Sequence, residues 1–412
     1  MLTAVSEAVT VGWAGVEYLA EPVPTGAAYE IFTNVPADGF VPNPRPSAPL
    51  PFRRFVHATE VELLEGAVPT SFDGPLCLPL SPTMSMSTAH RLSQSMPGSS
   101  SRTDAATRAM RESIRIRRGT RMVKILSGRQ LAGHLRGWLP QGFCHREYDI
   151  AHLRTPADLA ILATDRDGYR DDHDDVVFAL RWRAIDARDY TTPYFADFSG
   201  LTMMSPHARV GPPVLGTGFA PTSHHIVPEF VTADLADLAM PAHAELIAFT
   251  SDGTEVLLYR YLAEQRAWGR LSGPQWRGLL SGVDGVAPDQ EYFPVPSTET
   301  RIVGTFHGTS YEVIADPREN EFLVLAKVRA LRAPVSSPAR HTPTVTWRGV
   351  RCTVIRNSDG WLRLRLLRPS PEALERTGAA CVERGIYETW APATEAVDPA
   401  DIVVPYDIGS GQ

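Results

Sequence analysis

The sequence predicts an α+β protein dominated by β-structure, with a mixed α/β central region followed by repeated β-hairpin units. The hairpin units are expected to form a small barrel or twisted sheet with one C-terminal helix. Three observations predict this. Strand-like runs of β-branched and aromatic residues recur, such as Val176–Arg183. The 35 prolines and 31 glycines imply many loops and short elements. The segment Thr305–Leu325 also shares its pattern with Thr346–Leu366.

The two similar segments correspond at one fixed offset. Each has an aromatic residue, a glycine two positions later, a pair of β-branched residues, and then a turn and a short alternating strand. Corresponding residues are Phe306 and Trp347, Gly308 and Gly349, and Val313 and Val354. This indicates one hairpin unit used twice, over 305–325 and 346–366. Trp13-Ala14-Gly15 repeats the aromatic-x-Gly pattern a third time, over a shorter stretch.

A chain of 412 residues is long enough for two or three hydrophobic cores. We predict four parts from the changes in composition. They are 1–80, an N-terminal β-rich segment with a Pro-rich arm; 81–103, a mobile linker; 104–245, a mixed α/β ligand-binding domain; and 246–412, a β-rich domain with the twin hairpins. The loop at 281–298 is the alternative place for the last boundary.

Helices are predicted where capping residues precede apolar runs. A short helix is expected over Ser127–Trp138. A second should begin at Thr155-Pro156, pass through Leu159–Ala163 and stop near Gly168. A short helix is expected over Ser272–Leu280. The clearest start is Ser370-Pro371-Glu372, from which a helix should run to about Glu383, with Gly385 beyond its end.

Strands are predicted from alternation and from turn residues. Residues 9–35 should form strands, and Val176–Arg183 is the most regular strand of the central region. Leu246–Phe249 and Val256–Tyr261 should form a hairpin, because Asp252-Gly253 between them tolerates a positive φ. In Val176–Arg183, Arg181 and Arg183 should lie opposite Trp182, on a face that opens to solvent or to an anionic ligand. Alternation over Trp361–Leu366 is that of a half-buried strand, or of an interaction face with Trp361, Arg363 and Arg365.

Composition favours a cytoplasmic, bacterial-type protein. The net charge of −7 makes nucleic acid an unexpected partner for the whole molecule. The four cysteines are scattered without a CxxC pair, and the first residues lack the pattern of a secretory signal. No apolar run is long enough to cross a membrane.

Most familiar catalytic and metal-binding motifs are absent. His243-Ala-Glu245 has half of a zinc-deaminase pattern but no accompanying cysteine pair, so no metal site is predicted. The acidic run Asp165–Asp175 does not match a calcium loop at its first and last ligand positions. Adjacent His224 and His225 would point to opposite sides of a strand. No Walker, dinucleotide-binding or Gly-x-Ser-x-Gly sequence occurs. The cofactor stays unknown.

One loose set of residues remains as a candidate site. Arg118 precedes a predicted strand, Tyr148 precedes a predicted helix, Tyr194 follows the strand at 176, and Glu229 closes the region. An arginine can hold a pyrophosphate with two hydrogen bonds, and an aromatic ring can stack on a nicotinamide. A carboxylate can stabilise a ribose that becomes positively charged in the transition state. We therefore predict substrate-binding roles for Arg118, Tyr148 and Tyr194 and a catalytic role for Glu229.

In the order of these elements, residues 115–235 resemble NAD-cleaving toxin domains, although the Ser-Thr-Ser triplet and the Glu-x-Glu pair are missing. The resemblance implies an intracellular enzyme acting on a nucleotide or NAD-like substrate, by ADP-ribosyl transfer or NAD glycohydrolysis. The alternative is a non-catalytic β-rich interaction, adaptor or immunity-type protein, which would bind a protein partner through its C-terminal β-units.

Overall fold

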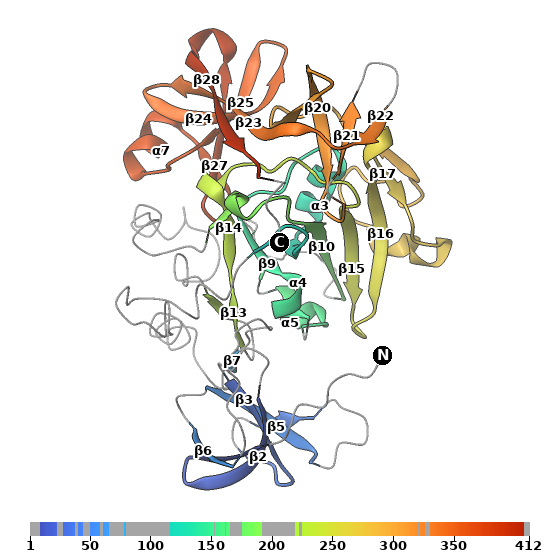
Figure 1. Ribbon diagram of the computed structural model, residues 1–412, viewed down its shortest axis with the longest axis vertical. Helices are drawn as coiled ribbons and strands as arrows, with labels where there is room; N and C mark the ends of the chain where they lie inside the picture. Colours follow the sequence, from blue (N-terminus) through green and yellow to red (C-terminus); the bar gives the residue numbers. More distant parts are fainter. Residues whose placement is uncertain are drawn as a thin grey trace. The chain divides into compact units, whose positions relative to one another are not determined.

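The computed structural model describes residues 9–22, 28–37, 40–43, 50–57, 61–65, 78–79, 116–151, 153–160, 162–164, 175–191, 219–221, 225–319, 321–325 and 330–407. Residue contacts divide the chain into two compact units (Figure 1). Unit 1 comprises Met1–Arg115, Tyr148–His152 and Pro212–Glu229. Unit 2 comprises Ile116–Glu147, Leu153–Gly211 and Phe230–Gln412. The linker predicted over 81–103 lies outside the described residues.

Unit 1 contains two small antiparallel sheets. The larger has the order β4-β5-β3-β2-β1-β6, and the smaller has the order β12-β13-β7. Their bounds are β1 (Val9–Trp13), β2 (Val16–Pro22), β3 (Ala28–Thr33), β4 (Val41–Pro42), β5 (Phe52–His57), β6 (Glu62–Glu65), β7 (Leu78–Pro79), β12 (Phe219–Pro221) and β13 (His225–Pro228). Val9, Val11, Tyr29, Ile31 and Val56 form a buried cluster in the larger sheet.

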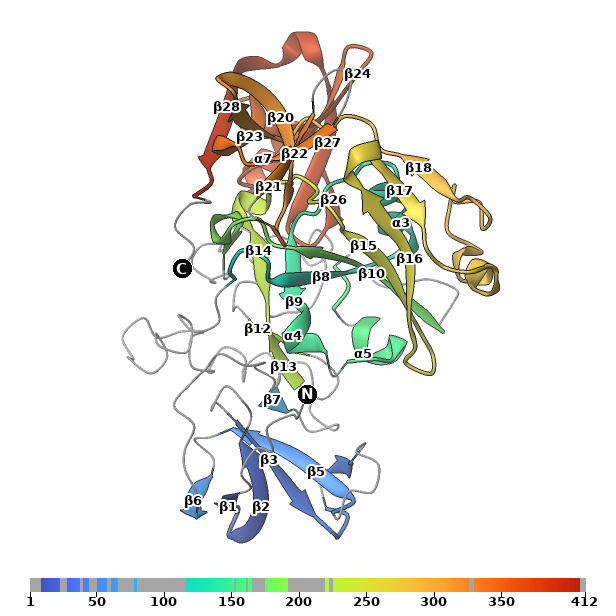
Figure 2. The ribbon, with the colours of Figure 1, turned by 45° about the vertical axis from the view of Figure 1, so that its right-hand side comes forward.

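Unit 2 is built on two large sheets. The first has the order β11-β14-β9-β8-β10-β15-β16-β17-β18. Its strands are β8 (Arg121–Leu126), β9 (Phe143–Arg146), β10 (Val176–Arg183), β11 (Tyr190–Thr191), β14 (Phe230–Thr232), β15 (Glu245–Thr250), β16 (Glu255–Leu262), β17 (Ala267–Arg270) and β18 (Tyr292–Pro294). Figure 2 shows β8, β10, β15 and β16 side by side. Val177, Ala179 and Leu180 of the central β10 are completely buried.

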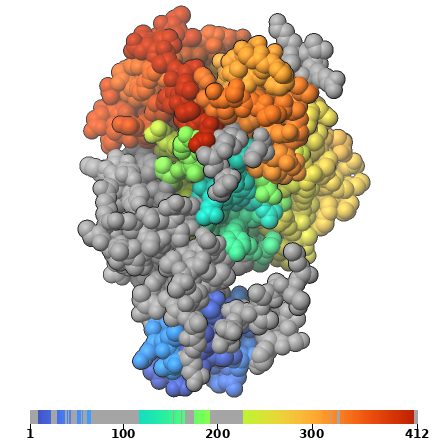
Figure 3. Space-filling view, in the orientation of Figure 1, coloured from blue at the N-terminus to red at the C-terminus, as the bar shows by residue number. Residues whose placement is uncertain are grey.

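The second sheet of unit 2 has the order β22-β21-β20-β19-β23-β24-β25-β27-β26, with β28 also paired to β23. Its strands are β19 (Arg301–Phe306), β20 (Thr309–Asp316), β21 (Glu321–Leu325), β22 (Ala330–Ala333), β23 (Ser336–Trp347), β24 (Val350–Ser358), β25 (Trp361–Leu366), β26 (Ala380–Glu383), β27 (Ile386–Pro392) and β28 (Val397–Pro405). In the space-filling view, the orange side chains of this sheet lie next to the yellow ones of the first sheet (Figure 3).

The predicted β-dominated architecture is therefore confirmed. Of the two shapes predicted for the C-terminal region, the sheet is formed. Its end strands β22 and β26 do not pair with each other in the described part of the chain, so a barrel is not closed there. The boundary predicted between residues 245 and 246 falls inside β15, which pairs with β10 on one side and β16 on the other. Main-chain pairing thus continues across that position.

The predicted helices are present but shorter than expected. α3 (Gly128–Leu135) begins at a capping box formed by Ser127 and Gln130. α5 (Pro156–Ala160) begins at the predicted Thr155, whose hydroxyl accepts from the Asp158 amide. Pro274–Leu280 forms a 3-10 helix, η6. Glu147–Ile150 adds one further turn, α4.

The C-terminal helix requires a correction. α7 (Pro371–Thr377) is capped by Ser370 as predicted, but it ends six residues before the expected Glu383. Gly378 takes a left-handed conformation with φ of 64° and terminates the helix. Ala380–Glu383 form the strand β26 instead. The prediction took Gly385 as the stop and overlooked the earlier glycine.

The twin hairpins share their first turn. His307-Gly308 and Arg348-Gly349 both have positive φ at the two turn residues, which is the two-residue hairpin turn that matches strand twist. Ala14-Gly15 has the same conformation. The second turns differ. Val313 pairs with Val324, whereas Val354 pairs with Leu364, because a register shift follows Val354. Whether the two hairpins are copies of one unit stays a prediction, which superposition of their backbones would test.

A buried polar cluster in unit 2 ties the second sheet to the 3-10 helix η2 (Ala187–Asp189). Arg340 Nε lies 3.1 Å from Asp189 Oδ1, and the Tyr406 hydroxyl donates to the same carboxylate at 3.0 Å. Burial raises the pKa of Asp189 from 3.8 to about 6, although Arg340 and Tyr406 act in the opposite direction. The folded state therefore binds this proton more tightly than the unfolded state does.

We expect Asp189 to make the protein less stable as the pH rises. The pKa of Asp189 is higher in the folded protein than in the unfolded chain. The contribution of Asp189 to the free energy of unfolding therefore falls by about 3 kcal/mol between pH 4 and pH 7. The Asp189→Asn variant should lose this pH dependence. The control variant Asp289→Asn should keep it, because Asp289 is exposed. Urea denaturation at several pH values measures both. If the wild type and Asp189→Asn show parallel pH profiles, the interpretation is wrong.

Candidate functional site

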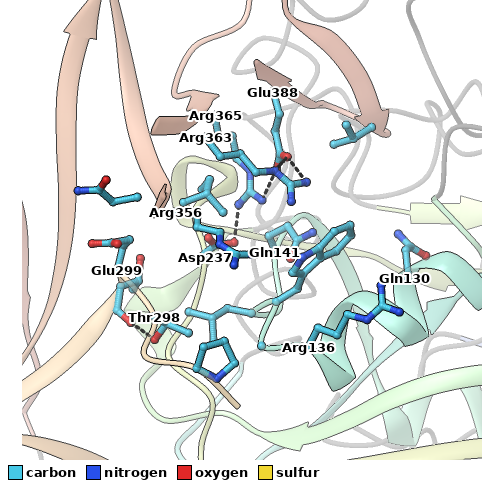
Figure 4. A pocket seen from close by; sticks show the side chains of 18 of the residues that line it. Gln130, Arg136, Gln141, Asp237, Thr298, Glu299, Arg356, Arg363, Arg365 and Glu388 are labelled. Atoms are coloured by element: carbon cyan, nitrogen blue, oxygen red, sulfur yellow. Dashed lines mark hydrogen bonds and ion pairs between the residues drawn. The ribbon is translucent and has the colours of Figure 1, made fainter. Parts of the chain in front are cut away.

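A pocket of about 220 Å³ lies within unit 2, and we call it the polar pocket (Figure 4). It is lined by α3 and the loop that follows it, by Pro296–Thr300, and by β24, β25, β27 and the end of β26. Its lining is strongly charged. The arginines are Arg129, Arg136, Arg356, Arg363 and Arg365, and the carboxylates are Asp237, Glu299, Glu383 and Glu388. Trp138 contributes the one aromatic ring.

The wall formed by α3 and its loop is held by close packing. A Cβ atom on Gly133 would lie 2.2 Å from Trp138 Cε3, so only glycine lets the indole rest on the helix. His134 is buried, and its Nδ1 lies 2.8 Å from the Trp138 carbonyl oxygen. The His134 carbonyl in turn accepts from Trp268 Nε1 at 3.0 Å. Burial lowers the pKa of His134 to about 4, so this imidazole is neutral at pH 7.

One side of the pocket rests on a buried ion pair. The Lys124 ammonium and the Glu383 carboxylate form a salt bridge, with side-chain exposures of 1% and 2%. Glu383 also accepts from Thr164 Oγ1 at 2.8 Å and from Gln130 Nε2 at 3.1 Å. The ammonium donates to the Gln141 carbonyl at 2.9 Å. A fully hydrogen-bonded pair of this kind fixes the positions of the side chains around it.

A second buried cluster is formed by Arg363 and Arg365 of β25, Glu388 of β27 and Asp237. Arg365 bridges Asp237 at 2.5 Å and Glu388 at 2.6 Å, and Arg363 holds the other Glu388 oxygen at 2.5 Å (Figure 4). Burial alone would raise the pKa of Glu388, but Arg365 and Arg363 outweigh it and lower that pKa. Burial raises the pKa of Asp237 even though Arg365 opposes it. Arg365 is therefore used in holding two carboxylates.

Three strands present a row of cationic and aromatic side chains on the same face as the Arg365 cluster. Arg356 of β24 pairs directly with Arg363 of β25, and Arg363 pairs with Trp390 of β27. Directly opposed residues of antiparallel strands lie on the same face. The Arg363 guanidinium also stacks on the Trp138 ring, 4.6 Å from its centroid. Trp390 is 48% exposed, and Trp361 on the same face is 50% exposed.

Several polar groups of the pocket have no protein partner among the described residues, and three of them are candidates for ligand contacts. The exposed Arg356 guanidinium and the half-buried Glu299 carboxylate form no hydrogen bond or ion pair there. Gln141 is buried, and its Oε1 also has no donor. Figure 4 shows Arg356 and Glu299 on the same side of the pocket, away from Gln130 and Arg136. The site thus offers a cation, an anion and a neutral acceptor to a ligand.

The structure places Arg118, one of the predicted binding residues, in unit 2. Its guanidinium donates to the carbonyl oxygens of Ile185 at 3.3 Å, Asp316 at 3.2 Å and Glu319 at 2.9 Å. Burial lowers its pKa from the usual arginine value. These contacts hold a turn against the second sheet and use both terminal nitrogens, whereas the buried Nε has no acceptor among the described residues.

The other predicted residues are not gathered around Arg118 within one unit. Tyr148 is 55% exposed on α4, and Glu229 is 1% exposed between β13 and β14. Both belong to unit 1. Tyr194 lies outside the described residues. The predicted set therefore stays a hypothesis.

Sequence reasoning missed the polar pocket because its residues come from segments far apart in the chain. Arg129 and Arg356 are separated by most of unit 2. One signal was present. Alternation over Trp361–Leu366 places Leu362, Leu364 and Leu366 in the core and leaves Trp361, Arg363 and Arg365 on the other face. The predicted interaction face is thus the face that borders the pocket.

Other site types find no support in the described part of the chain. No group of three or more His, Cys, Asp or Glu side chains there is arranged to hold a metal ion. Cys144, Cys352 and Cys381 are buried free thiols. None of the described helices has the length and apolar character needed to cross a bilayer. Comparisons with protein-family models, with curated proteins and with solved structures found no match to this chain.

Proposed function

We propose that unit 2 binds a small nucleotide-type ligand in the polar pocket. The observation behind this proposal is the row Arg356–Arg363–Trp390 on one face of the second sheet, beside a pocket that contains unpartnered polar groups. A phosphate would bind the Arg356 guanidinium with charge-assisted hydrogen bonds. A planar ring at the edge of the pocket would stack on the exposed indole of Trp390, which does not itself line the pocket, as bases do on aromatic side chains.

Two further features narrow the ligand class. The volume of about 220 Å³ is below the roughly 300–1,000 Å³ of pockets that enclose drug-sized ligands, which favours a mononucleotide over a dinucleotide. The buried Gln141 Oε1 needs a donor, because a buried acceptor left without one costs about 1–3 kcal/mol. A hydroxyl or amino group of a nucleotide would supply it.

Calorimetric titration of the full chain tests this proposal. The ligand panel is a set of nucleoside monophosphates, nicotinamide mononucleotide and NAD. We expect Arg356→Ala to weaken mononucleotide binding by about tenfold or more, because a charge-assisted hydrogen bond is worth about 1.5–3 kcal/mol. Arg368→Ala is the matched control, since Arg368 is exposed, follows β25 and does not line the pocket. Equal affinities of the two variants, or no binding by the wild type, would refute the proposal.

A catalytic role is the second candidate, and Glu299 favours it. This carboxylate lines the same pocket and has no protein partner among the described residues. It could stabilise positive charge on a ribose during NAD glycohydrolysis or ADP-ribosyl transfer. Nicotinamide release by wild type, Glu299→Gln and Glu229→Gln separates the hypotheses. Loss with Glu299→Gln alone assigns the reaction to the polar pocket, and loss with Glu229→Gln alone supports the residue predicted from sequence. No release by the wild type favours the non-catalytic alternative.

A further inference from the structure

A second pocket, of about 170 Å³, lies in unit 2 at the ends of β8, β10, β15 and β16. We call it the arginine pocket. Its lining contains Arg121, Arg181, Arg183, Arg260, Arg318 and His243, with Glu245 as the one carboxylate. None of these residues lines the polar pocket. The sequence already predicted that the face of β10 with Arg181 and Arg183 opens to solvent or to an anion.

Strand pairing puts two like charges directly opposite each other at this site. Arg183 of β10 pairs with Arg121 of β8. Like charges at directly opposed positions destabilise a sheet unless other groups compensate them. Arg121 is compensated by Glu147, at 2.6 Å from its Nε. Arg183 forms no ion pair among the described residues, and its one side-chain hydrogen bond goes to the Gly119 carbonyl at 2.9 Å.

The surrounding ion pairs do not neutralise the site. Arg181 is bound to Glu147, Glu245 and Glu255 at 2.6–2.8 Å, so its charge is fully used. In the ion pairs that the described residues form around the pocket, six arginines share five carboxylates, and Arg183 is a seventh arginine without an ion pair there. The six are Arg121, Arg154, Arg181, Arg260, Arg318 and Arg332, and the five are Glu147, Glu245, Glu255, Glu264 and Asp316. The excess is two positive charges.

His243 adds a donor in a strained conformation. Its φ of 62° lies in the left-handed region, which is costly for a residue with a Cβ and is often retained at functional sites. Its Nε2 is 3.3 Å from Asp316 Oδ2 but forms no hydrogen bond among the described residues. Burial, followed by the charge of Arg318, lowers the pKa of His243, so the ring is neutral at pH 7. A neutral imidazole has one N–H, and because Nε2 lies beside Asp316, the tautomer with the proton on Nδ1 is the one that would donate to an oxyanion.

We propose that the arginine pocket binds a phosphate group, free or as an ester, through Arg183 and Arg121 with His243 as an additional donor. A phosphate would neutralise the excess charge and relieve the Arg121–Arg183 repulsion. Guanidinium groups suit phosphate because their planar fork donates two parallel hydrogen bonds. The volume exceeds that of a water molecule, about 30 Å³, several times over, which leaves room for such a group.

Titration of the full chain with inorganic phosphate and with pyrophosphate, at constant ionic strength, tests the assignment. We expect Arg183→Ala to weaken binding by about tenfold or more and Arg183→Lys to weaken it less, because lysine keeps the charge and loses the fork. Arg121→Gln is a second variant with the same expected direction. Its carboxylate partner Glu147 stays paired with Arg181, so folding should survive.

A variant of each pocket serves as the control for the binding test of the other pocket. Arg356→Ala should leave phosphate binding at the arginine pocket unchanged, and Arg183→Ala should leave mononucleotide binding at the polar pocket within twofold. Loss of phosphate binding in Arg356→Ala but not in Arg183→Ala would overturn this inference and place the anion in the polar pocket. Absence of phosphate binding by the wild type would overturn it as well, without bearing on the mononucleotide test.

Discussion

Glu383→Ala should lower the free energy of unfolding by about 3–5 kcal/mol, because it leaves a buried lysine without its counter-charge. Lys124 and Glu383 are buried together, with side-chain exposures of 1% and 2%. Removing the carboxylate leaves an ammonium in the interior without its counter-charge, and such a group costs several kcal/mol. Thr164 and Gln130 would lose an acceptor at the same time.

Urea denaturation followed by tryptophan fluorescence measures this effect, because Trp13 is the one tryptophan outside unit 2. Glu291→Ala is the control. Its partner Arg277 lies 3.3 Å away in an exposed pair, which is worth at most about 1 kcal/mol. The double variant Lys124→Met with Glu383→Gln should lose less than Glu383→Ala, since no lone charge stays buried. Similar losses for Glu383→Ala and Glu291→Ala would contradict the argument.

Trp268→Ala should lower the free energy of unfolding by about 3–5 kcal/mol, because it removes the largest completely buried side chain among the described residues. The indole packs against Tyr261 at a centroid distance of 5.6 Å and donates to the His134 carbonyl. Trp268→Phe keeps most of the apolar contact and loses that hydrogen bond, so it should cost about 1–3 kcal/mol.

Trp361→Ala is the matched control for this series, because Trp361 is 50% exposed. It should change the free energy of unfolding by less than about 1 kcal/mol. The denaturation is best followed by circular dichroism here, since each variant removes a fluorophore. A Trp268→Ala variant as stable as Trp361→Ala would show that the β17–α3 packing contributes little to stability.

Local signals in the sequence predicted much of the secondary structure. Asp252-Gly253 marks a tight turn because glycine accepts a positive φ without steric cost. The turns at His307-Gly308 and Arg348-Gly349 have the same cause but were not predicted, because only the later turn of each hairpin unit was expected. Ser127 and Ser370 mark helix starts because their hydroxyls accept from the amides of the first turn. These interactions join residues a few positions apart, so the sequence alone contains them.

The candidate site depends on contacts of another kind. Lys124 meets Glu383, and Arg365 meets Asp237, across more than a hundred positions in each case. Neither pair has a local signature, and a buried lysine looks like any other lysine in a strand. Arg118 shows the converse. It looked free to bind a ligand, yet its donors are used by distant carbonyl groups such as that of Glu319. Tertiary pairing decides which charges remain for function.

The interleaving of the two units also governs how the protein can be made. Unit 1 is assembled from three separate stretches and is complete only when Glu229 has been synthesised. The second sheet of unit 2 can be completed only later in synthesis, because its strand β28 (Val397–Pro405) pairs with β23. At about 5–20 residues per second, the early strands emerge from the ribosome well before their partners. No single cut in the chain would release either unit whole. Premature termination should therefore harm folding far more than the number of missing residues suggests.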